Sequence, residues 1–361
     1  MAELLSIYIY PYVFIVVLLG FVGFFKGGEK FSLPSVFLLH FLTVLLLLFR
    51  NPFAPDDAAN YLQMYELQGS FNDVFTAYHG SYFFSFTQYV GNIFSLEGRS
   101  FLIAQSIFFY FISSAGLRML FKSNRMYLMC LAFFSLTSTF LLLYTNVVRQ
   151  GLALSLIIFS LGCFTRNFRN VGYACLFLSV FSHFSSVLIV GAIFLTRCTV
   201  FKKTWYLWLL IFLPSLTVVS QLFIFSLSSL GGFFLKIEAF SNINYNNTLV
   251  YVKVFLIYLS AVFFYVIGSK FNMFSAPLYR FVFSIYVFSI AIVFFTLPVL
   301  LLSSRYLYYS SALMPILYTL FFFNKPNFFT VRTRFIVGFS AIFILGFVVY
   351  NFSSTRSQLG I

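Results

Sequence analysis

Residues 32–61 read SLPSVFLLHFLTVLLLLFRNPFAPDDAANY and decide the fold class. The first part is an almost unbroken apolar run, long enough to cross a bilayer as a helix. Ser32 and Pro34 are typical of a first helical turn, with Ser32 as the expected N-cap. The second part is polar and carries two adjacent carboxylates, Asp56 and Asp57. The stretch therefore predicts a membrane span followed by a polar loop.

The rest of the chain has the composition of a polytopic membrane protein. Its 361 residues are 61% hydrophobic and 8% charged, and the mean hydropathy is +0.97. No soluble domain hides so much apolar surface. The apolar runs never alternate strictly, which disfavours a β-barrel. We expect a single all-α transmembrane domain over residues 1–361, with about 10–11 membrane helices.

The expected spans follow from the apolar runs. They cover residues 4–25, 32–49, 100–121, 126–144, 148–165, 204–226, 249–268, 281–302, 306–323 and 335–352, and residues 171–196 form a further apolar segment. The first run lacks a basic start and a cleavage site, so it is expected to remain as a span. The loop 50–98 is the longest polar segment. It should contain short helices at 57–67 and after Ser70-x-x-Asp73, and an interfacial segment at 82–94.

The charge distribution gives the orientation. The chain has 22 Lys and Arg against eight Asp and Glu, a net charge of +14. The basic residues stand in short clusters between apolar runs, as in cytoplasmic loops, so no nucleic-acid partner is expected. If the loop with Lys26 and Lys30 is cytoplasmic, loop 50–98 lies outside. The four cysteines lie in or beside apolar runs without metal-ligand spacing, and no metal site is predicted.

Residues 171–196 leave two topologies open. A full span would put Arg197, Lys202 and Lys203 outside, against the positive-inside rule. A re-entrant hairpin bent at His183 would return them to the cytoplasm, and we favour it. Non-helical backbone at membrane depth must face protein or water, so such a bend would line a cavity.

Several polar residues then fall on the outer face. Asp56 and Asp57 could supply a general base for a sugar hydroxyl or ligate a divalent metal, or they could simply cap a helix in a solvated loop. Arg149, with Gln150 beside it, stands at the mouth of the span 148–165. A guanidinium fork there suits a phosphate or pyrophosphate, although an interfacial arginine can also reach for lipid headgroups. Arg305 repeats this situation at another outer turn.

Histidine and tyrosine side chains are further candidates. His183, between serines, could accept a proton or donate to a phosphate, or it could be structural. His40 lies inside an unbroken span and is expected to be structural. Tyr61, Tyr65 and Tyr78 could stack on sugar rings or belong to an interfacial aromatic belt.

The order of three short motifs resembles the EpsG-like family of Wzy-type polysaccharide polymerases. The motifs are Asp57-x-x-Asn60-Tyr61, Arg149-Gln150-x-x-Ala153 and His183-x-Ser185, and Arg305-Tyr306 is similar to a late arginine of such proteins. The Asp56-Asp57 doublet and the aromatic segment 82–94 depart from the simple pattern, which leaves open which carboxylate matters.

The resemblance implies a GT-C-like glycosyltransferase of the bacterial inner membrane that polymerises O-antigen or a related surface polysaccharide. Such enzymes transfer the growing glycan from undecaprenyl pyrophosphate to the non-reducing end of a new lipid-linked repeat unit, at the periplasmic face. The implied partners are undecaprenyl-pyrophosphate-linked oligosaccharides, membrane lipids and a chain-length regulator protein. Neither a nucleotide sugar nor a cofactor or metal is expected.

Under this resemblance, Arg149 and then Arg305 stabilise the pyrophosphate leaving group. Asp57 or His183 serves as the base, and a single displacement inverts the anomeric centre. The further substrate-binding candidates are Gln150, Asp56, Asn60 and Tyr61. Two alternatives remain, namely an O-antigen ligase or polyprenyl-phosphate-sugar-dependent transferase, and a flippase of lipid-linked sugar. The spans are nearly free of polar residues, which favours an outer-face enzyme over a flippase.

Overall fold

The computed structural model describes residues 2–23, 28–49, 56–78, 80–198, 203–228 and 247–324. All regular structure in these ranges is helical, as predicted. Seven of the described helices are long and apolar enough to cross a membrane, and a bent pair would make an eighth span. The chain is therefore a multi-pass membrane protein. The last expected span, 335–352, lies outside the described residues.

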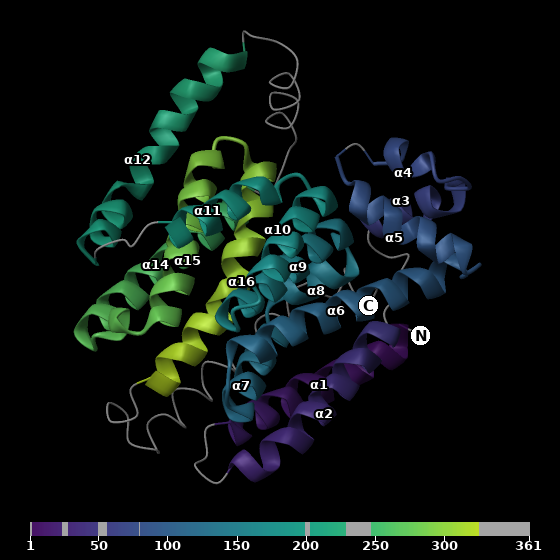
Figure 1. Cartoon of the computed structure of the whole chain (residues 1–361), viewed down its shortest axis with the longest axis horizontal. Helices are drawn as coiled ribbons and strands as arrows, with labels where there is room; N and C mark the ends of the chain where they lie inside the picture. The colour runs from purple at the N-terminus through teal and green to yellow at the C-terminus, as the bar shows by residue number, and fades with distance from the viewer. Residues whose placement is uncertain are drawn as a thin grey trace. The chain divides into compact units, whose positions relative to one another are not determined.

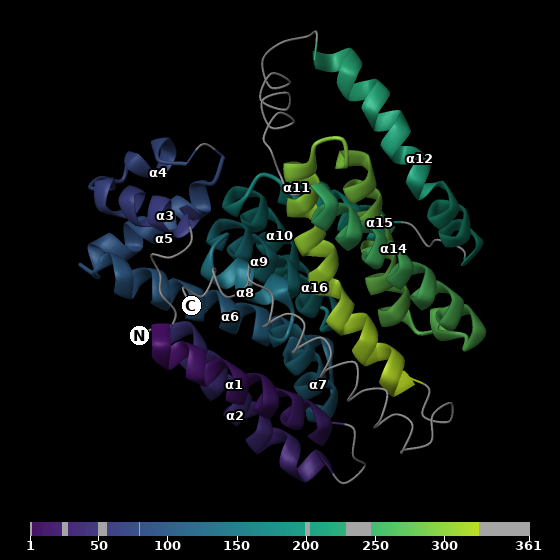
Figure 2. The same ribbon diagram turned by 180° about the vertical axis from the view of Figure 1, so that it is seen from behind.

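The helices follow the predicted runs closely (Figures 1 and 2). In chain order they are α1 (Ala2–Val22), α2 (Glu29–Phe49), α3 (Asp56–Leu67), α4 (Asp73–Thr76), α5 (Tyr82–Ile93), α6 (Gly98–Leu120), α7 (Asn124–Ser135), α8 (Ser138–Thr145), α9 (Val148–Thr165), α10 (Arg169–Ser182), α11 (Ser186–Cys198), α12 (Lys203–Ser228), α14 (Asn247–Lys270), a 3₁₀ turn η2 (Met273–Ser275), α15 (Pro277–Thr296) and α16 (Leu300–Asn324).

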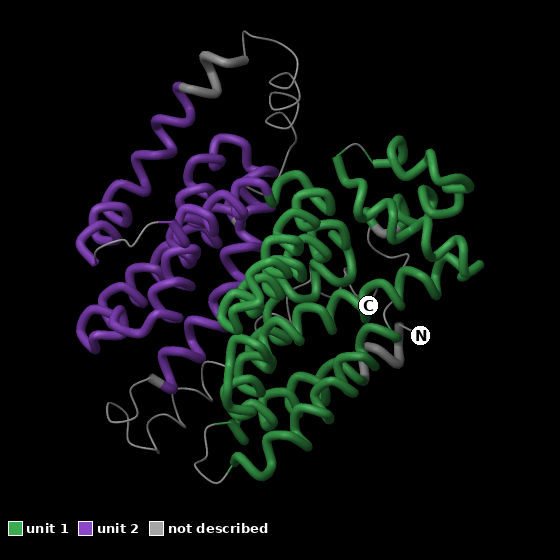
Figure 3. The backbone as a smooth tube through the Cα atoms, viewed as in Figure 1, with its two compact units in different colours: residues 1–186, 326–361 green, residues 187–325 purple. Residues whose placement is uncertain are grey.

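The described residues form two compact units, which Figure 3 shows in two colours. The first contains α1 to α10, and the second contains α11 to α16. Each unit is described by itself below. The expectation of one transmembrane domain over the whole chain stays a prediction.

The centre of the first unit is the pair α6 and α9, which cross at two glycines. A Cβ atom at Gly116 would lie 2.6 Å from the backbone of Phe159, and one at Gly162 would lie 2.6 Å from the carbonyl oxygen of Gly116. Small residues let membrane helices approach this closely and gain van der Waals contact. Helix α10 packs along the other side of α9. The two ends of α9 are thereby fixed, one at Arg149 and the other beside Arg166.

His40 joins three helices of the same unit. Its Nδ1 lies 2.7 Å from the hydroxyl of Tyr110 on α6, and its Nε2 lies 3.0 Å from the hydroxyl of Tyr127 on α7. Buried polar groups within a membrane helix need such partners. These contacts are those of a structural residue, which is the role expected from the sequence.

The run 126–144 forms two helices, α7 and α8, which meet at a bend of 71°, so it is either one broken span or a re-entrant loop. The expectation of one span there stays a prediction. Thr137 starts the new direction, since its side chain accepts a hydrogen bond from the backbone N–H of Phe140 at 3.2 Å. The expectation that Ser32 is an N-cap was wrong. Helix α2 begins at Glu29, and the Ser32 hydroxyl donates back to the Glu29 carbonyl at 2.7 Å, a bond that lets serine stay inside a helix.

In the second unit, the turn that was expected next to Arg305 lies several residues earlier in the chain. Helix α15 ends at Thr296 and α16 begins at Leu300, so Arg305 lies inside a helix and not at a turn. The pair Ser303 and Ser304 does not break the helix, because each hydroxyl donates to a backbone carbonyl, at 3.2 and 2.8 Å. The placement of Arg305 at an outer turn was therefore wrong.

The apolar segment 171–196 is broken where the sequence predicted. Helix α10 ends at Ser182 and α11 begins at Ser186, with His183 in extended backbone conformation between them. The boundary of the two units falls at the same place. The break is confirmed, whereas the re-entrant hairpin stays a prediction.

Candidate functional site

The polar loop after α2 folds into a small helical layer made of α3, α4 and α5 (Figure 1). Polar side chains of α5 bind backbone carbonyls of the α3 segment. The Asn92 amide donates to the carbonyls of Tyr65 and Gln68 at 2.9 and 2.7 Å, and the Gln88 amide donates to the carbonyl of Tyr61 at 3.3 Å. The two Asn92 bonds satisfy carbonyls near the end of the short helix α3, and the Gln88 bond adds a second donor to a carbonyl in its middle. They hold α3 in a fixed position on α5.

The turn between α3 and α4 contains the Ser70–Asp73 interaction that the sequence suggested, with the Asp73 side chain bonding to the backbone of the preceding residues. The Asp73 carboxylate accepts hydrogen bonds from the backbone N–H groups of Ser70 and Gly69, at 2.7 and 2.9 Å. The bond from Ser70 is the main reason that the pKa of Asp73 lies below its usual value. Asp73 thus acts as a local structural group.

Two tyrosine rings of this layer contact the side chain of Arg149. Its guanidinium carbon lies 4.9 Å from the ring centre of Tyr78 and 5.6 Å from that of Tyr61. Both distances are within the range of cation–π attraction, which strengthens where water is excluded. The Nε atom of Arg149 is buried and has no hydrogen-bond partner among the described residues. A cation held by rings in this way keeps donor capacity for an added ligand.

The two tyrosine rings are fixed by their own neighbours. Phe84 packs at ring-centre distances of 5.3 Å from Tyr61 and 5.4 Å from Tyr78. The Gln88 amide also lies 3.4 Å from the Tyr78 hydroxyl. Burial raises the pKa of the Tyr78 phenol, while the hydrogen bond from Gln88 and the charge of Arg149 lower it in part. The phenol therefore stays neutral near physiological pH and presents its ring to Arg149.

The backbone around Arg149 adds to the positive potential. Arg149 is the second residue of α9, whose N-cap position, Val147, makes no side-chain cap hydrogen bond. The turn from α8 is tight, because a Cβ atom at Gly151 would lie 2.2 Å from the carbonyl oxygen of Leu143. The first N–H groups of a helix carry partial positive charge and form a ready anion site. The helix start and the guanidinium together suit a phosphate-bearing ligand.

His183 belongs to the same end of this unit. Helices α9 and α10 are antiparallel neighbours joined by a short turn, so the end of α10 returns toward the start of α9. At about 1.5 Å per residue, α9 is about 27 Å long and α10 about 21 Å, which puts His183 roughly one turn deeper than Arg149. Its side chain is buried, with 8% of its surface exposed.

The loop layer also reaches the break at His183. Tyr82 on α5 packs against Phe181 on α10, with ring centres 6.2 Å apart. A Cβ atom at Gly80 would lie 3.9 Å from Cβ of Phe184. Contacts of Tyr78, Gly80 and Tyr82 thus extend from Arg149 to the residues around His183.

The structure brings together some of the predicted site residues. Asp57 is half-buried on α3, four residues before Tyr61 and so on the same face of the helix. Gln150 is buried next to Arg149. Asn60 is exposed, on a different face of α3 from Tyr61.

Two other predicted residues are not placed at this site. Asp56 is the first residue of α3, but its side chain lies outside what the structure describes. Arg305 belongs to the second unit. Its role beside Arg149 stays a prediction.

Each of the three tyrosine rings has a packing partner within the protein. Tyr61 and Tyr78 are buried and face Arg149, and Tyr65 is buried and stacks on Phe101 with ring centres 4.4 Å apart. Stacking on sugar rings, or membership of an interfacial aromatic belt, stays a prediction. Tyr61 contributes to the site by holding the arginine.

Gln88 is the residue that the sequence reasoning missed. It is buried in α5 and bonds both to the carbonyl of Tyr61 and to the hydroxyl of Tyr78. A signal was present, because Ser85, Gln88 and Asn92 recur at helical spacing within an otherwise aromatic segment. A polar stripe on a short apolar helix indicates a partner with open backbone groups.

The chemistry available at this site is anion binding combined with proton transfer. Arg149 and the start of α9 offer positive potential, and Asp57 and His183 are groups that can accept a proton. Among the described residues, no group of three or more His, Cys, Asp or Glu side chains is arranged to hold a metal ion.

Comparison with known proteins gives one match. The family model described as EpsG family matches residues 34–359, nearly the whole chain. No curated protein and no solved structure matches the chain.

Proposed function

This chain belongs to the EpsG family, whose members are Wzy-type polymerase-like membrane proteins, and from that premise we propose that it polymerises O-antigen or a related surface polysaccharide. At the level of the family it is a polysaccharide polymerase-like membrane glycosyltransferase. The proposed donor is a growing glycan on undecaprenyl pyrophosphate. The proposed acceptor is the non-reducing end of a new lipid-linked repeat unit at the periplasmic face of the inner membrane.

The placement of Arg149 is the observation that carries this proposal. Its guanidinium is half-buried over two tyrosine rings at the start of a membrane helix, and its Nε has no hydrogen-bond partner among the described residues. A diphosphate leaving group gains negative charge as the glycosidic carbon–oxygen bond breaks. Donors that are already oriented stabilise that charge without reorganisation, and this is commonly the largest single contribution to catalysis.

The reaction needs one proton transfer besides the displacement. The acceptor hydroxyl attacks the anomeric carbon, the bond to the pyrophosphate oxygen breaks, and undecaprenyl pyrophosphate leaves with the electron pair. The hydroxyl proton passes to a base, for which Asp57 and His183 are the candidates. A single displacement of this kind inverts the anomeric centre.

The two candidate bases differ in their surroundings. Asp57 is half-buried on α3, one helical turn from Tyr61, and His183 is buried at the break between α10 and α11. A carboxylate in the polar loop suits an acceptor sugar that enters from the aqueous side. We therefore propose Asp57 as the base and His183 as a hydrogen-bond donor to the diphosphate.

The test is the length distribution of the surface polysaccharide in a strain that depends on this protein. Arg149→Ala should remove the ladder of chain lengths on a gel and leave single repeat units on the lipid A core. The matched control is Arg169→Ala, which removes an exposed arginine at the far end of the α9–α10 pair. A full ladder from Arg149→Ala would remove the pyrophosphate role.

The same strain separates the polymerase from a ligase. Loss of a ligase leaves long polymer on undecaprenyl pyrophosphate and no repeat units on the lipid A core. Loss of a polymerase leaves lipid-linked single units that the ligase still transfers. Extraction of the lipid-linked glycans from the Arg149→Ala strain, followed by sizing, therefore distinguishes the two activities.

A further inference from the structure

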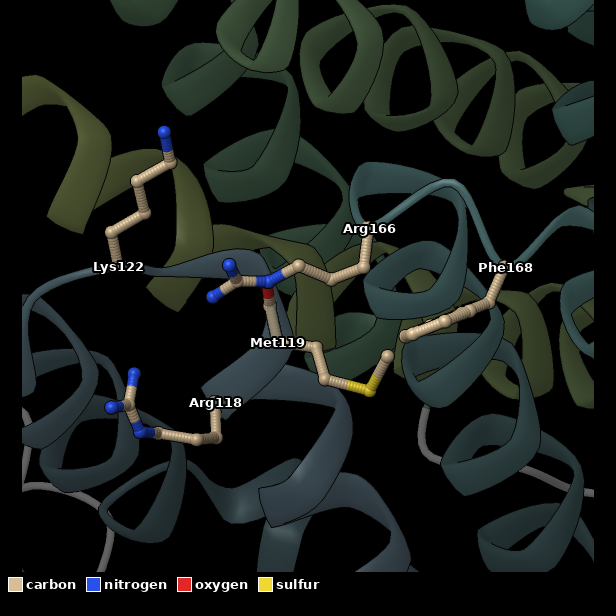
Figure 4. Close-up of a pocket in the computed structure, with 5 residues that line it drawn as sticks. All are labelled: Arg118, Met119, Lys122, Arg166 and Phe168. Carbon is tan, nitrogen blue, oxygen red and sulfur yellow. The ribbon is translucent and has the colours of Figure 1, made fainter.

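The opposite end of α9 carries a second cationic site, which the proposed polymerase chemistry does not use. An open pocket of about 610 Å³ lies where α6 and α9 end, lined by Arg118, Met119, Lys122, Arg166 and Phe168 (Figure 4). All five residues belong to the first unit. Helix α9 separates this pocket from Arg149 by about 27 Å, close to the thickness of a bilayer core.

Both arginines of the pocket are held in place by backbone carbonyls. Arg166 donates from Nε to the Met119 carbonyl at 2.8 Å and from Nη2 to the Phe121 carbonyl at 3.4 Å. Arg118 donates from Nη1 to the same Phe121 carbonyl at 2.9 Å. These carbonyls lie at the end of α6, where helix geometry leaves carbonyls open, and the Met119 carbonyl also accepts from the Thr165 hydroxyl at 3.3 Å. Each guanidinium has five N–H donors, so both keep donors for a ligand after these bonds are made.

The turn that carries Arg166 is itself a defined motif. Asn167 has a positive φ of 63°, the N–H of Phe168 bonds to the Cys163 carbonyl at 2.9 Å, and the N–H of Asn167 bonds to the Phe164 carbonyl at 3.3 Å. This is the pattern of a Schellman motif, which ends a helix in one conformation. The position of Arg166 relative to the end of α6 is therefore preorganised.

The charge balance of the pocket is one-sided. Three cations line it, and no carboxylate is among its lining residues. The acidic residue described near this end of the unit is Glu29, which accepts from the Ser123 hydroxyl at 3.3 Å and acts electrostatically on Arg125. Lys122 is exposed and has no hydrogen-bond partner among the described residues. An added anion would neutralise charges that the described protein groups leave uncompensated.

The surroundings match the depth of lipid headgroups. Phe168, at the rim, is 58% exposed although it is a large aromatic residue. Aromatic side chains at the ends of membrane helices commonly lie at the headgroup level. Basic pockets between membrane helices bind the phosphates of acidic lipids.

We propose that Arg118, Lys122 and Arg166 form a binding site for a phosphate-bearing anion at the membrane face opposite Arg149. The chemistry is that of a phosphodiester or diphosphate group, bound by two guanidinium groups that backbone carbonyls hold in place and by one exposed ammonium group. Such a group could belong to an acidic lipid or to a soluble phosphate, and the two sources are separated by the test below.

The test is native mass spectrometry of the full-length protein in detergent, titrated in separate arms with phosphatidylglycerol, with phosphatidylcholine and with inorganic pyrophosphate. We expect one phosphate-bearing anion to bind more tightly than phosphatidylcholine. Lys122→Gln should weaken that binding about fivefold, and Arg118→Gln with Lys122→Gln about 25-fold, since each basic residue near an anionic surface contributes a factor of about five. Preference for phosphatidylglycerol identifies a lipid, and preference for pyrophosphate identifies a soluble anion.

The matched control is Lys270→Gln, which makes the same charge change at the end of α14 in the second unit. Lys270→Gln should leave the affinity unchanged. If Lys270→Gln and Lys122→Gln weakened anion binding equally, the binding would come from the general surface charge of the protein, and the proposal would be overturned. Binding of neither anion above the level of phosphatidylcholine would also overturn it. Lys122 makes no hydrogen bond to the described protein groups, so its variant tests the site without disturbing the helix ends that the arginines hold.

Discussion

The guanidinium carbon of Arg149 lies 4.9 Å from the centre of the Tyr78 ring. Arg149 is the second residue of the membrane helix α9, and Tyr78 belongs to the polar loop that follows α2, earlier in the chain. The contact shows that the loop after α2 folds back onto the mouth of α9. Arg149, the proposed phosphate-binding residue, and the loop that carries Asp57 thereby become parts of one unit.

The shape of the Arg149 side chain should matter as well as its charge. Arg149→Lys keeps the positive charge but loses the planar fork and its flat contact with the two rings. We expect polymer formation to fall on the order of 10²-fold, comparable to the loss of a donor that stabilises a developing anion. The measurement is the rate of chain extension in membrane vesicles supplied with lipid-linked repeat units. Arg169→Lys, at an exposed position, should leave that rate unchanged.

The ring of Tyr78 should matter more than its hydroxyl. Tyr78→Phe keeps the surface that faces Arg149 and loses one long hydrogen bond from Gln88. Tyr78→Leu removes the ring, and with it a cation–π contact of about 2 kcal/mol in a desolvated site. We therefore expect chain extension to fall roughly thirtyfold in Tyr78→Leu and little in Tyr78→Phe. Equal rates in the two variants would contradict a role for the ring.

Gln88 should act as a positioning residue. Gln88→Leu leaves the carbonyl of Tyr61 and the hydroxyl of Tyr78 without this donor, which should lower the free energy of unfolding by about 1–3 kcal/mol. It should also loosen both rings against Arg149 and reduce the rate of chain extension. Thermal unfolding and the extension rate are measured on the same preparation.

Asn92→Leu is the matched control for Gln88→Leu. Asn92 makes two comparable bonds to the carbonyls of Tyr65 and Gln68, but it does not bond the residues under Arg149. Its variant should lose similar stability and keep its rate at a temperature where it stays folded. If both variants lost activity only in proportion to their stability, Gln88 would be structural alone.

The two adjacent carboxylates should differ. Asp57 is half-buried and shares a helix face with Tyr61, whereas Asp56 is the first residue of α3. Asp57→Asn should reduce chain extension by about 10² or more, as for loss of a general base, and Asp56→Asn should reduce it less. Wild-type ladders from both variants would remove the carboxylates from the mechanism.

Cys198 provides a test of the predicted topology without an added cysteine. It is the exposed one of the four cysteines and ends α11, whereas Cys130, Cys163 and Cys175 are buried. If residues 171–196 form a re-entrant hairpin, a membrane-impermeant maleimide should label Cys198 from the cytoplasmic side of inverted vesicles. Labelling from the outside of intact spheroplasts would replace the hairpin with a full span. Cys198→Ser shows the background from the buried thiols.

The sequence could predict the helices of this protein because lipid leaves the backbone few choices. Backbone N–H and C=O groups in a bilayer core must bond within their own segment, so a long apolar run becomes a helix whatever its neighbours are. The run 148–165 and helix α9 coincide for this reason. The predictions for Ser32 and Arg305 were wrong because serine hydroxyls can bond to backbone carbonyls and so remain inside a helix. Ser32 and Ser304 bond to carbonyls of their own helices, and Ser303 bonds to a carbonyl of the preceding helix.

The sequence by itself determined that this protein is a helical, multi-pass membrane protein, and it singled out Arg149, Asp57 and His183. Only the tertiary structure decided what surrounds Arg149, namely the rings of Tyr61 and Tyr78 and the amide of Gln88 that holds them. The physical reason is that helix formation in lipid is a local requirement of the backbone. The partner of a buried side chain depends instead on which helices pack together, and residues far apart in the chain settle that jointly.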